Sequence, residues 1–169
     1  RHPNVVSVLD IVETSDDLAL VMEYIAGESL SKLVAAARAK KKAIDPAIAA
    51  AIMSDVLEGL HAAHHATNES GVPLQIIHRD VSPQNVIVGV DGVARVVDFG
   101  IAKAIGRLQD TTQEGRVKGK LAYMAPEQLV RGRTVDHRCD VWASAVVLWE
   151  MLSGEPLFTG AADAMHETF

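Results

Sequence analysis

Three short motifs in a fixed order constrain this chain more than any other feature of its sequence. His78-Arg79-Asp80 precedes Asn85, Asp98-Phe99-Gly100 follows, and Ala125-Pro126-Glu127 comes last. Each tripeptide alone occurs by chance in many proteins, but the order and spacing together are specific. One short loop carries Asp80 and Asn85 and therefore fixes their separation. The β-branched run at residues 93–97 predicts a strand that directs Asp98 toward the same point.

Hydrophobic patterning predicts the elements around these motifs. Residues 5–12 and 18–24 are rich in strand-forming side chains, and the polar turn between them predicts a β-hairpin that Gly27 ends. Asp91-Gly92 predicts a second tight turn. Further strands are predicted at residues 76–77, 86–88 and 93–97, and helices at about residues 30–38, 46–65 and 138–153.

The long helix at residues 46–65 has a clear start, because Asp45 can cap it and Pro46 suits its first position. Apolar side chains recur every four residues along it and predict one buried stripe, made by Ile48, Ile52, Val56 and Leu60. Its end carries His61, His64 and His65, which lack partners at metal-ligand spacing and indicate an ordinary helix end.

The other helices follow similar signals. Ser29 is a candidate cap for the first, and Gly154 ends the last. The last helix is apolar nearly all round, which predicts a central, buried position in which Trp142 and Trp149 belong to the core.

Composition narrows the class of protein. The chain has 169 residues, 49% of them hydrophobic, and a formal net charge of -6. An acidic balance argues against a nucleic-acid partner, because such a partner selects a basic surface. The longest apolar run, residues 47–53, is far shorter than a membrane span of about 20 residues. A single cysteine, Cys139, excludes an internal disulfide, and together these features predict a cytoplasmic location without membrane contact from this segment.

The motif set resembles the eukaryotic-type Ser/Thr protein kinases, and among them the bacterial members. Flanking segments extend the resemblance over essentially the whole chain: Arg1-His2-Pro3-Asn4, Val21-Met22-Glu23-Tyr24 and Asp140-Val141-Trp142. It implies an α+β, protein-kinase-like fold, mainly the helical C-lobe with a remnant β-hairpin of the N-lobe. Residues 1–169 are then a single partial domain, with the N-lobe remnant and hinge at residues 1–25 and a truncated C-lobe at 26–169.

The resemblance also implies an activity and its cofactors. We expect an ATP- and Mg²⁺-dependent kinase that transfers the γ-phosphate to Ser/Thr hydroxyls of protein substrates in bacterial signalling. Phosphoryl transfer needs positioning and charge neutralisation more than covalent chemistry. Asp80 would face the incoming hydroxyl as base or orienter, while Asn85 and Asp98 would hold Mg²⁺ through oxygen atoms.

Supporting roles are implied in the same way. Met22 would be the gatekeeper, and the backbone of Glu23 and Ile25 would bind adenine. Glu28 would reach the ribose and Ile87 would lie under the adenine ring. Structural or regulatory roles fall to His78 and Phe99 in a hydrophobic spine, Gly100 beside them, Asp140 under the catalytic loop, Arg79 and Glu127 as charge partners, and Thr111 and Thr112 as candidate phosphosites.

Two positions depart from the family pattern. Ser82 stands where the family usually has Lys, and Lys120 stands where it usually has Thr. The hypothesis is a compensated swap in which Lys120 supplies the cation near Asp80 and the γ-phosphate. The opposing interpretation is that Lys120 is a solvated loop residue and activity is reduced.

An alternative to an active enzyme is a pseudokinase that acts as a nucleotide-binding or scaffold module. Ser82 favours this alternative, whereas Asp80, Asn85 and Asp98 favour catalysis. The sequence lacks the Gly-rich loop, the strand Lys and the helix Glu of the family pattern. By the resemblance, these features would lie before residue 1. We therefore expect the chain to be a piece of a longer protein and a weak catalyst by itself.

Overall fold

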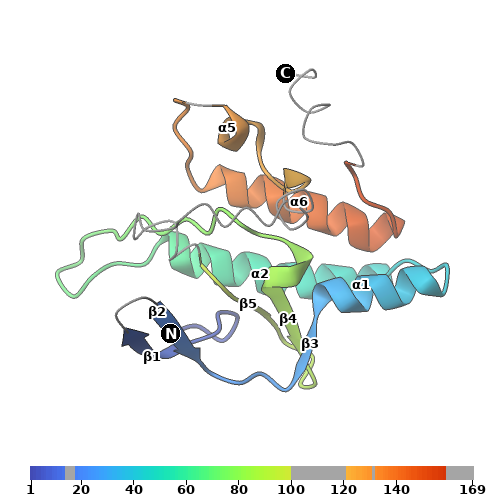
Figure 1. Cartoon of the computed structure of the whole chain (residues 1–169), viewed down its shortest axis with the longest axis horizontal. Helices are drawn as coiled ribbons and strands as arrows, with labels where there is room; N and C mark the ends of the chain where they lie inside the picture. Colours follow the sequence, from blue (N-terminus) through green and yellow to red (C-terminus); the bar gives the residue numbers. More distant parts are fainter. Residues whose placement is uncertain (14–17, 100–120, 131, 159–169) are drawn as a thin grey trace.

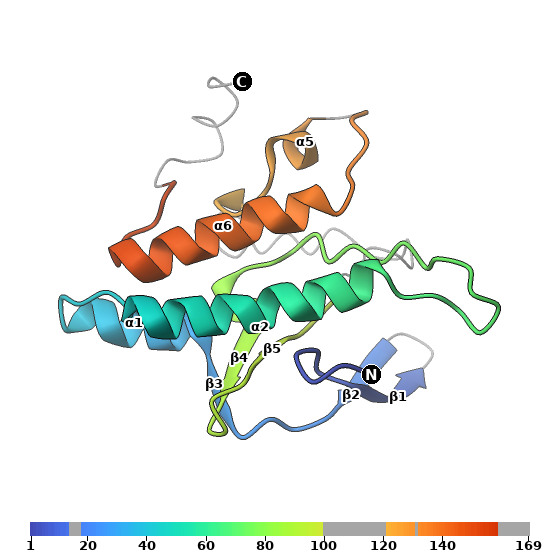
Figure 2. The same ribbon diagram turned by 180° about the vertical axis from the view of Figure 1, so that it is seen from behind.

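One long helix, α2 (Pro46–His64), runs through the middle of the molecule, with elements on both sides of it (Figure 1). Helix α6 (Arg138–Ser153) packs on one side, and a three-stranded sheet crosses the other. The opposite view in Figure 2 shows the same layers and sets the β1–β2 hairpin beyond the sheet. The computed structural model describes residues 1–13, 18–99, 121–130 and 132–158.

Helix α2 begins where the sequence predicts. The Asp45 carboxylate accepts hydrogen bonds from the amides of Ala47 and Ile48, which would otherwise lack partners. The predicted stripe is confirmed except at its first member, because Ile48 is 56% exposed. A four-residue step overshoots a helical turn by about 40°, so three steps rotate the stripe by about 120°. The buried face instead combines Ala49, Ile52, Met53, Val56, Gly59 and Leu60.

The predicted hairpin is confirmed with shorter strands. Strands β1 (Val8–Glu13) and β2 (Leu18–Met22) are antiparallel, with Ile11 opposite Leu20. All six residues of β1 are exposed. The hairpin therefore owes its described structure to its own ladder more than to burial.

The second sheet has the order β3–β4–β5, from strands β3 (Gly27–Ser29), β4 (Val86–Gly89) and β5 (Ala94–Val96). Strands β4 and β5 and the turn at Asp91-Gly92 are as predicted, and Gly92 has a φ of 80°. Strand β3 corrects the prediction that Gly27 only ends a strand. Gly27 faces Gly89, and a Cβ atom there would lie 2.2 Å from the Val88 carbonyl oxygen. Glycine is thus required by close backbone approach.

The strand predicted at residues 76–77 is wrong. Neither residue belongs to a strand, and both are half-buried beside an apolar cavity. Their β-branched character serves packing instead of a ladder, which local propensity cannot distinguish.

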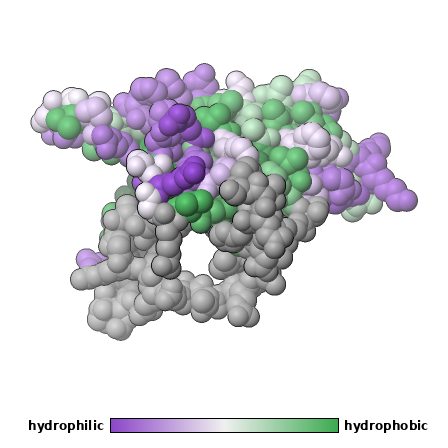
Figure 3. Space-filling view, turned by 90° about the horizontal axis from the view of Figure 1, so that it is seen from above, coloured by the Kyte–Doolittle hydropathy of each residue, from purple (hydrophilic) through white to green (hydrophobic). Residues whose placement is uncertain are grey.

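Helix α6 has the predicted bounds, and Gly154 ends it with a φ of 76° and an amide that donates a hydrogen bond to the Glu150 carbonyl. The prediction that it is buried nearly all round is wrong. Val141 is 54% and Trp149 is 51% exposed, so Trp149 is not a core residue, while Trp142 is half-buried against Phe158. Figure 3, seen from above, shows hydrophobic side chains between hydrophilic margins on the described part of this side.

The remaining helices complete the core. Helix α1 (Leu30–Ala39) starts at Ser29, whose hydroxyl pairs with that of Ser31 and makes no cap to the backbone, contrary to prediction. A one-turn 3-10 helix, η1 (Pro83–Asn85), and the short α5 (Pro126–Leu129) carry two of the motifs. Side chains from α1, α2, β4, β5 and α6 form one core that includes Leu30, Val34, Val56, Val86, Val96, Val147 and Met151.

Among the helices that the structure describes, none combines the length and apolar character that crossing a bilayer requires.

Candidate active site

The loop between residues 78 and 85 folds back on itself through Asn85. Pro83 starts η1, and the Asn85 amide donates to the Ser82 carbonyl. The Asn85 side-chain nitrogen then donates to Asp80 twice, to its carbonyl oxygen at 2.7 Å and to its carboxylate Oδ2 at 3.0 Å. Both partners are acceptors, so the amide nitrogen must face them. The Asn85 Oδ1 atom is therefore the oxygen that remains to meet a cation.

Asp98 lies just after β5, next to the point where the chain contacts Asn85. The Val97 amide donates to the Asn85 carbonyl at 3.0 Å, which ties the end of β5 to the loop. Asp98 has a φ of 58°, a left-handed conformation rare for a residue with a side chain, and it is exposed. A carboxylate and an amide oxygen are hard ligands of the kind Mg²⁺ prefers, usually alongside substrate phosphates. The residues present thus fit that ion.

His78 lies fully buried beneath these groups. Its Nε2 atom is 2.9 Å from the Val97 carbonyl oxygen, and its Nδ1 atom accepts from the Asp80 amide at 3.2 Å. A carbonyl can only accept and an amide can only donate, so the ring is neutral with its proton on Nε2. Burial lowers the pKa of His78, outweighing a hydrogen bond to Val97 and the charges of Asp140, Asp80 and Asp98. The His78 ring also packs on the Phe99 ring, with 4.8 Å between the two ring centroids.

Asp140 of α6 holds the backbone of the same loop. Its carboxylate accepts from the amides of His78 at 2.9 Å and Arg79 at 2.8 Å, and it is 1% exposed. His64, at the end of α2, also reaches Asp140 Oδ2 from Nε2 at 2.7 Å. The sequence did not single out His64 for this role, because only the packing of α2 on α6 brings the two together.

A second polar cluster lies between α1, α6 and the segment before α5. The Tyr123 hydroxyl donates to Glu150 Oε2 at 2.5 Å, and Arg38 pairs with Glu150 Oε1 at 2.9 Å. Burial and the neighbouring Glu150 carboxylate raise the pKa of Tyr123 well above its usual range, so the phenol stays protonated. This cluster was not predicted from the sequence.

Short helix α5 lies against the loop at residues 78–85. The Gln128 side chain accepts from the Ala125 amide and donates to the Arg79 carbonyl, both at 3.0 Å. Glu127 lies in the same turn. The pKa of Arg138 is raised mainly by its hydrogen bond with Asp136, and the negative charge of Glu127 adds to that rise. No sequence signal identified Gln128, because its second partner is far away along the chain.

The predicted nucleotide residues lie in two sheets and in the connection between them. Met22 ends β2, and the Glu23 amide donates to the Ser7 carbonyl at 3.0 Å, while Ile25 follows in the connection to β3. Ile87 in β4 pairs with Ser29 and is half-buried. Glu28 is exposed, and a hydrogen bond from the Ser29 amide, followed by the interaction with Lys32, lowers its pKa.

Ser82 is 1% exposed, and its hydroxyl oxygen has no hydrogen-bond partner among the described residues. The position that carries lysine in the family pattern is therefore occupied here by a buried, uncharged side chain. Gly100, Thr111, Thr112 and Lys120 lie outside the described residues.

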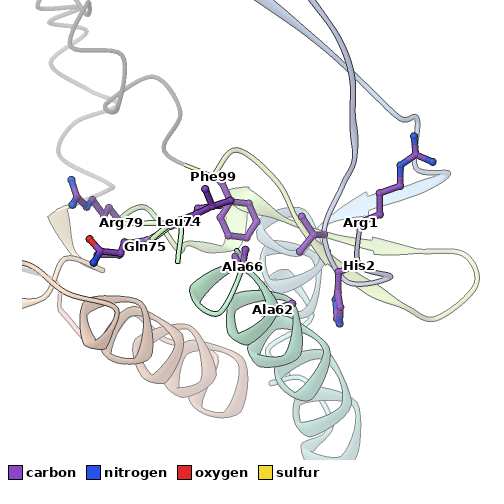
Figure 4. Close-up of a pocket in the computed structure, with 12 residues that line it drawn as sticks. Arg1, His2, Ala62, Ala66, Leu74, Gln75, Arg79 and Phe99 are labelled. Carbon is purple, nitrogen blue, oxygen red and sulfur yellow. The ribbon is translucent and has the colours of Figure 1, made fainter. Parts of the chain in front are cut away.

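An apolar cavity of about 510 Å³ lies beneath Phe99, apart from the carboxylates. Figure 4 shows Phe99 above Ala62 and Ala66 of α2, with the remaining labelled residues on either side: Arg1, His2, Leu74, Gln75 and Arg79. Its walls carry few polar groups, so it does not match a phosphate site. In the described part of the chain, no three side chains of His, Cys, Asp or Glu are grouped to hold a metal ion.

Comparison with known proteins gives a consistent result. The profile of the protein kinase domain family matches residues 1–168. The chain is 43% identical over 152 residues to the tyrosine-protein kinase MasK of Myxococcus xanthus, covering 90% of this chain and 23% of that protein.

Two further relatives carry a different name. The chain is 37% identical over 164 residues to the serine/threonine-protein kinase PknB of Mycobacterium leprae, covering 95% of this chain and 24% of that protein. It is also 37% identical over 165 residues to PknB of Mycobacterium tuberculosis, again covering 95% and 24%. The chain thus spans about a quarter of the length of these curated relatives.

Proposed function

We propose, on the premise that this chain belongs to the protein kinase domain family, that its full-length protein transfers the γ-phosphoryl group of ATP to a protein hydroxyl. The observation that carries the proposal is the pair of hydrogen bonds from the Asn85 amide nitrogen to Asp80. They hold a carboxylate and an amide oxygen side by side on one short loop. Phosphoryl transfer depends on such fixed polar groups.

Asp80 would accept the proton of the incoming hydroxyl or orient that hydroxyl toward the phosphoryl group. Asn85 Oδ1 and the Asp98 carboxylate would hold Mg²⁺. When bound, that ion neutralises phosphate charge. The neutral His78 ring would support Asp80 through its amide, and Asp140 fixes the peptides on either side of His78.

The proposed nucleotide site uses Met22, the backbone of Glu23 and Ile25, and Ile87. Glu28 would have to leave Lys32 to reach a ribose, which is a modest cost because exposed ion pairs contribute little stability. Residues 1–25 would be the N-lobe remnant and hinge, and residues 26–169 the C-lobe. We propose a cytoplasmic location because the reaction consumes ATP.

We propose Ser/Thr hydroxyls as acceptors. Pro83 and the segment at residues 125–128 are similar to the Ser/Thr group, and both PknB relatives are named serine/threonine kinases. A tyrosine acceptor is the second candidate, favoured by the name of the MasK relative and by the absence of lysine at Ser82. Phosphoamino-acid analysis of a labelled protein substrate separates the two.

The compensated swap between positions 82 and 120 remains a proposal that rests on the sequence. The buried Ser82 supplies no cation, so Lys120 would provide it. We expect Lys120→Thr to lower kcat by about 10²–10³, and Lys120→Thr with Ser82→Lys to restore much of it. Equal kcat in Lys120→Thr and the parent would contradict the compensated swap.

Regulation is proposed through the segment between Asp98 and Glu127. Phosphorylation at Thr111 or Thr112 would add a charged group for Arg79 to bind. Mass spectrometry after incubation with ATP tests this, and an active enzyme unmodified at both threonines would refute it.

The main experiment measures transfer from labelled ATP to a generic basic protein, with the full-length protein and its Asp80→Asn variant. We expect Mg²⁺-dependent transfer that Asp80→Asn lowers by at least about 100-fold. Folded parent protein that binds Mg-ATP in calorimetry but transfers nothing would favour the pseudokinase alternative. If neither binding nor transfer occurs, the site assignments are wrong.

A further inference from the structure

Gln128 of α5 connects two segments that are far apart along the chain. Its Nε2 atom donates to the Arg79 carbonyl, and its Oε1 atom accepts from the Ala125 amide, both at 3.0 Å. The two contacts fix the orientation of the side-chain amide, since a flipped amide would set donor against donor and acceptor against acceptor. One uncharged side chain therefore ties the backbone at Ala125 to the backbone at Arg79.

The Arg79 carbonyl belongs to the peptide unit that carries Asp80. The other polar end of that unit, the Asp80 amide, donates to His78 Nδ1 at 3.2 Å. The ring of His78 is itself held by the Val97 carbonyl at 2.9 Å. The peptide plane before Asp80 is thus gripped at its oxygen by Gln128 and at its nitrogen by His78.

This peptide needs such support. Arg79 has a φ of 64°, in the left-handed region that is unfavourable for a residue with a side chain. Asp140 holds the Arg79 amide at 2.8 Å, and this fixes only the peptide before Arg79. Rotation about the Arg79 Cα–C bond would move the Arg79 carbonyl and the Asp80 backbone together. The hydrogen bond from Gln128 opposes this rotation from outside the loop.

We propose that Gln128 is a positioning residue for Asp80, linking the segment at residues 125–129 to the geometry of the catalytic loop. The proposal rests on the proposed kinase activity for its catalytic consequence, whereas the mechanical link stands on the contacts alone. Rates of positioned reactions fall steeply when a reacting group shifts by about 1 Å. Loss of the link should therefore lower kcat while the KM for ATP stays unchanged.

Gln128→Glu tests the link directly. Glutamate keeps an oxygen to accept from the Ala125 amide and to support the start of α5, but it has no hydrogen to donate to the Arg79 carbonyl. Gln128→Ala removes both contacts. Gln75→Glu is the matched control, because it adds the same charge at an exposed position upstream of the loop.

Two quantities are measured in the full-length protein for all three variants. The first is kcat and KM for ATP and for a generic protein substrate, and the second is amide hydrogen exchange of peptides that cover residues 78–82. Thermal unfolding of each variant accompanies them, so that a folding defect is recognised. We expect Gln128→Glu and Gln128→Ala to lower kcat about five- to tenfold, the effect of one hydrogen bond. Exchange over residues 78–82 should accelerate in both, with Gln75→Glu unchanged.

The outcomes separate the two proposals. Normal exchange over residues 78–82 in a folded Gln128→Glu protein overturns the link, whatever the activity. An active parent whose kcat does not change in Gln128→Glu overturns its catalytic role. A defect in Gln128→Ala alone assigns Gln128 only to the start of α5. A parent without transfer, but with accelerated exchange in both variants, retains the link and refutes the proposed kinase activity instead.

Discussion

The loop at residues 78–85 and the β1–β2 hairpin are built in opposite ways. In the loop, the amides of His78, Arg79 and Asp80 and the carbonyl of Arg79 bond to three side chains, which are those of His78, Gln128 and Asp140. In the hairpin, the strands bond to each other and every residue of β1 is exposed. Two distant residues, Gln128 and Asp140, thus help to fix the loop, whereas each strand of the hairpin is fixed by its immediate neighbour.

This difference indicates which contacts determine the backbone geometry of each region. Irregular backbone has no ladder of its own, so buried polar groups must find side-chain partners. A hairpin satisfies its backbone locally and tolerates changes of surface side chains. We expect substitutions to have large effects around the loop and small effects in the hairpin.

The largest effect is expected for Asp140→Ala. The change leaves the buried amide of His78 and the part-buried amide of Arg79 without this acceptor, and it removes the Asp140 partner of His64. Two orphaned donors should lower the free energy of unfolding by about 2–6 kcal/mol and abolish phosphate transfer. Urea unfolding and the labelled-ATP assay measure both quantities.

The hairpin supplies the control for this change. Asp10 accepts from the adjacent Ile11 amide, at an exposed position. Asp10→Ala should change the free energy of unfolding by no more than about 0.5 kcal/mol. Equal losses in the two variants would remove the distinction between the regions.

Tyr123→Phe should have an intermediate effect. It deletes the hydroxyl that donates to Glu150 but leaves the pair between Arg38 and Glu150. We expect the free energy of unfolding to fall by about 1–2 kcal/mol, as for a partly buried hydrogen bond to a charged group. A neutral result would show that Arg38 alone satisfies Glu150.

A pH titration examines the loop without removing a loop contact. Burial lowers the pKa of His78 in the folded protein below its ordinary value of 6.5, so the unfolded chain binds more protons as the pH falls. The contribution of His78 to stability should be present above pH 6.5 and decrease as the pH falls from there toward the folded pKa. Thermal unfolding between pH 7.5 and 5.5 measures it. A His78→Tyr variant should show a flatter dependence, and an equal slope in both proteins would contradict the assignment.

The smallest effect is expected for Ile11→Thr in the hairpin. Ile11 is 58% exposed, and threonine keeps the β-branched shape that strands prefer. Unfolding in urea should change by less than about 0.5 kcal/mol, while light scattering should show less aggregation because an apolar edge has been reduced. A loss above about 1 kcal/mol would mean that the hairpin buries this side chain.

Local chemistry predicted several parts of this structure. The Asp45 cap, the Asp91-Gly92 turn and the Gly154 helix end depend on neighbouring residues only, and all three are confirmed. The motifs around Asp80, Asn85 and Asp98 identified the family, because their spacing is a property of the chain itself. Residue type and order were sufficient for these features.

Tertiary structure decided the rest. Gly27 became part of β3 because Gly89 approaches it closely, and His64 reached Asp140 because α2 packs on α6. Ile48 and Trp149 are exposed because each helix buries only the face that meets a neighbour. Gln128 acquired its second partner, the Arg79 carbonyl, from a loop 49 residues earlier in the chain. Sequence patterns report local preference, whereas these contacts exist only after distant segments have been brought together.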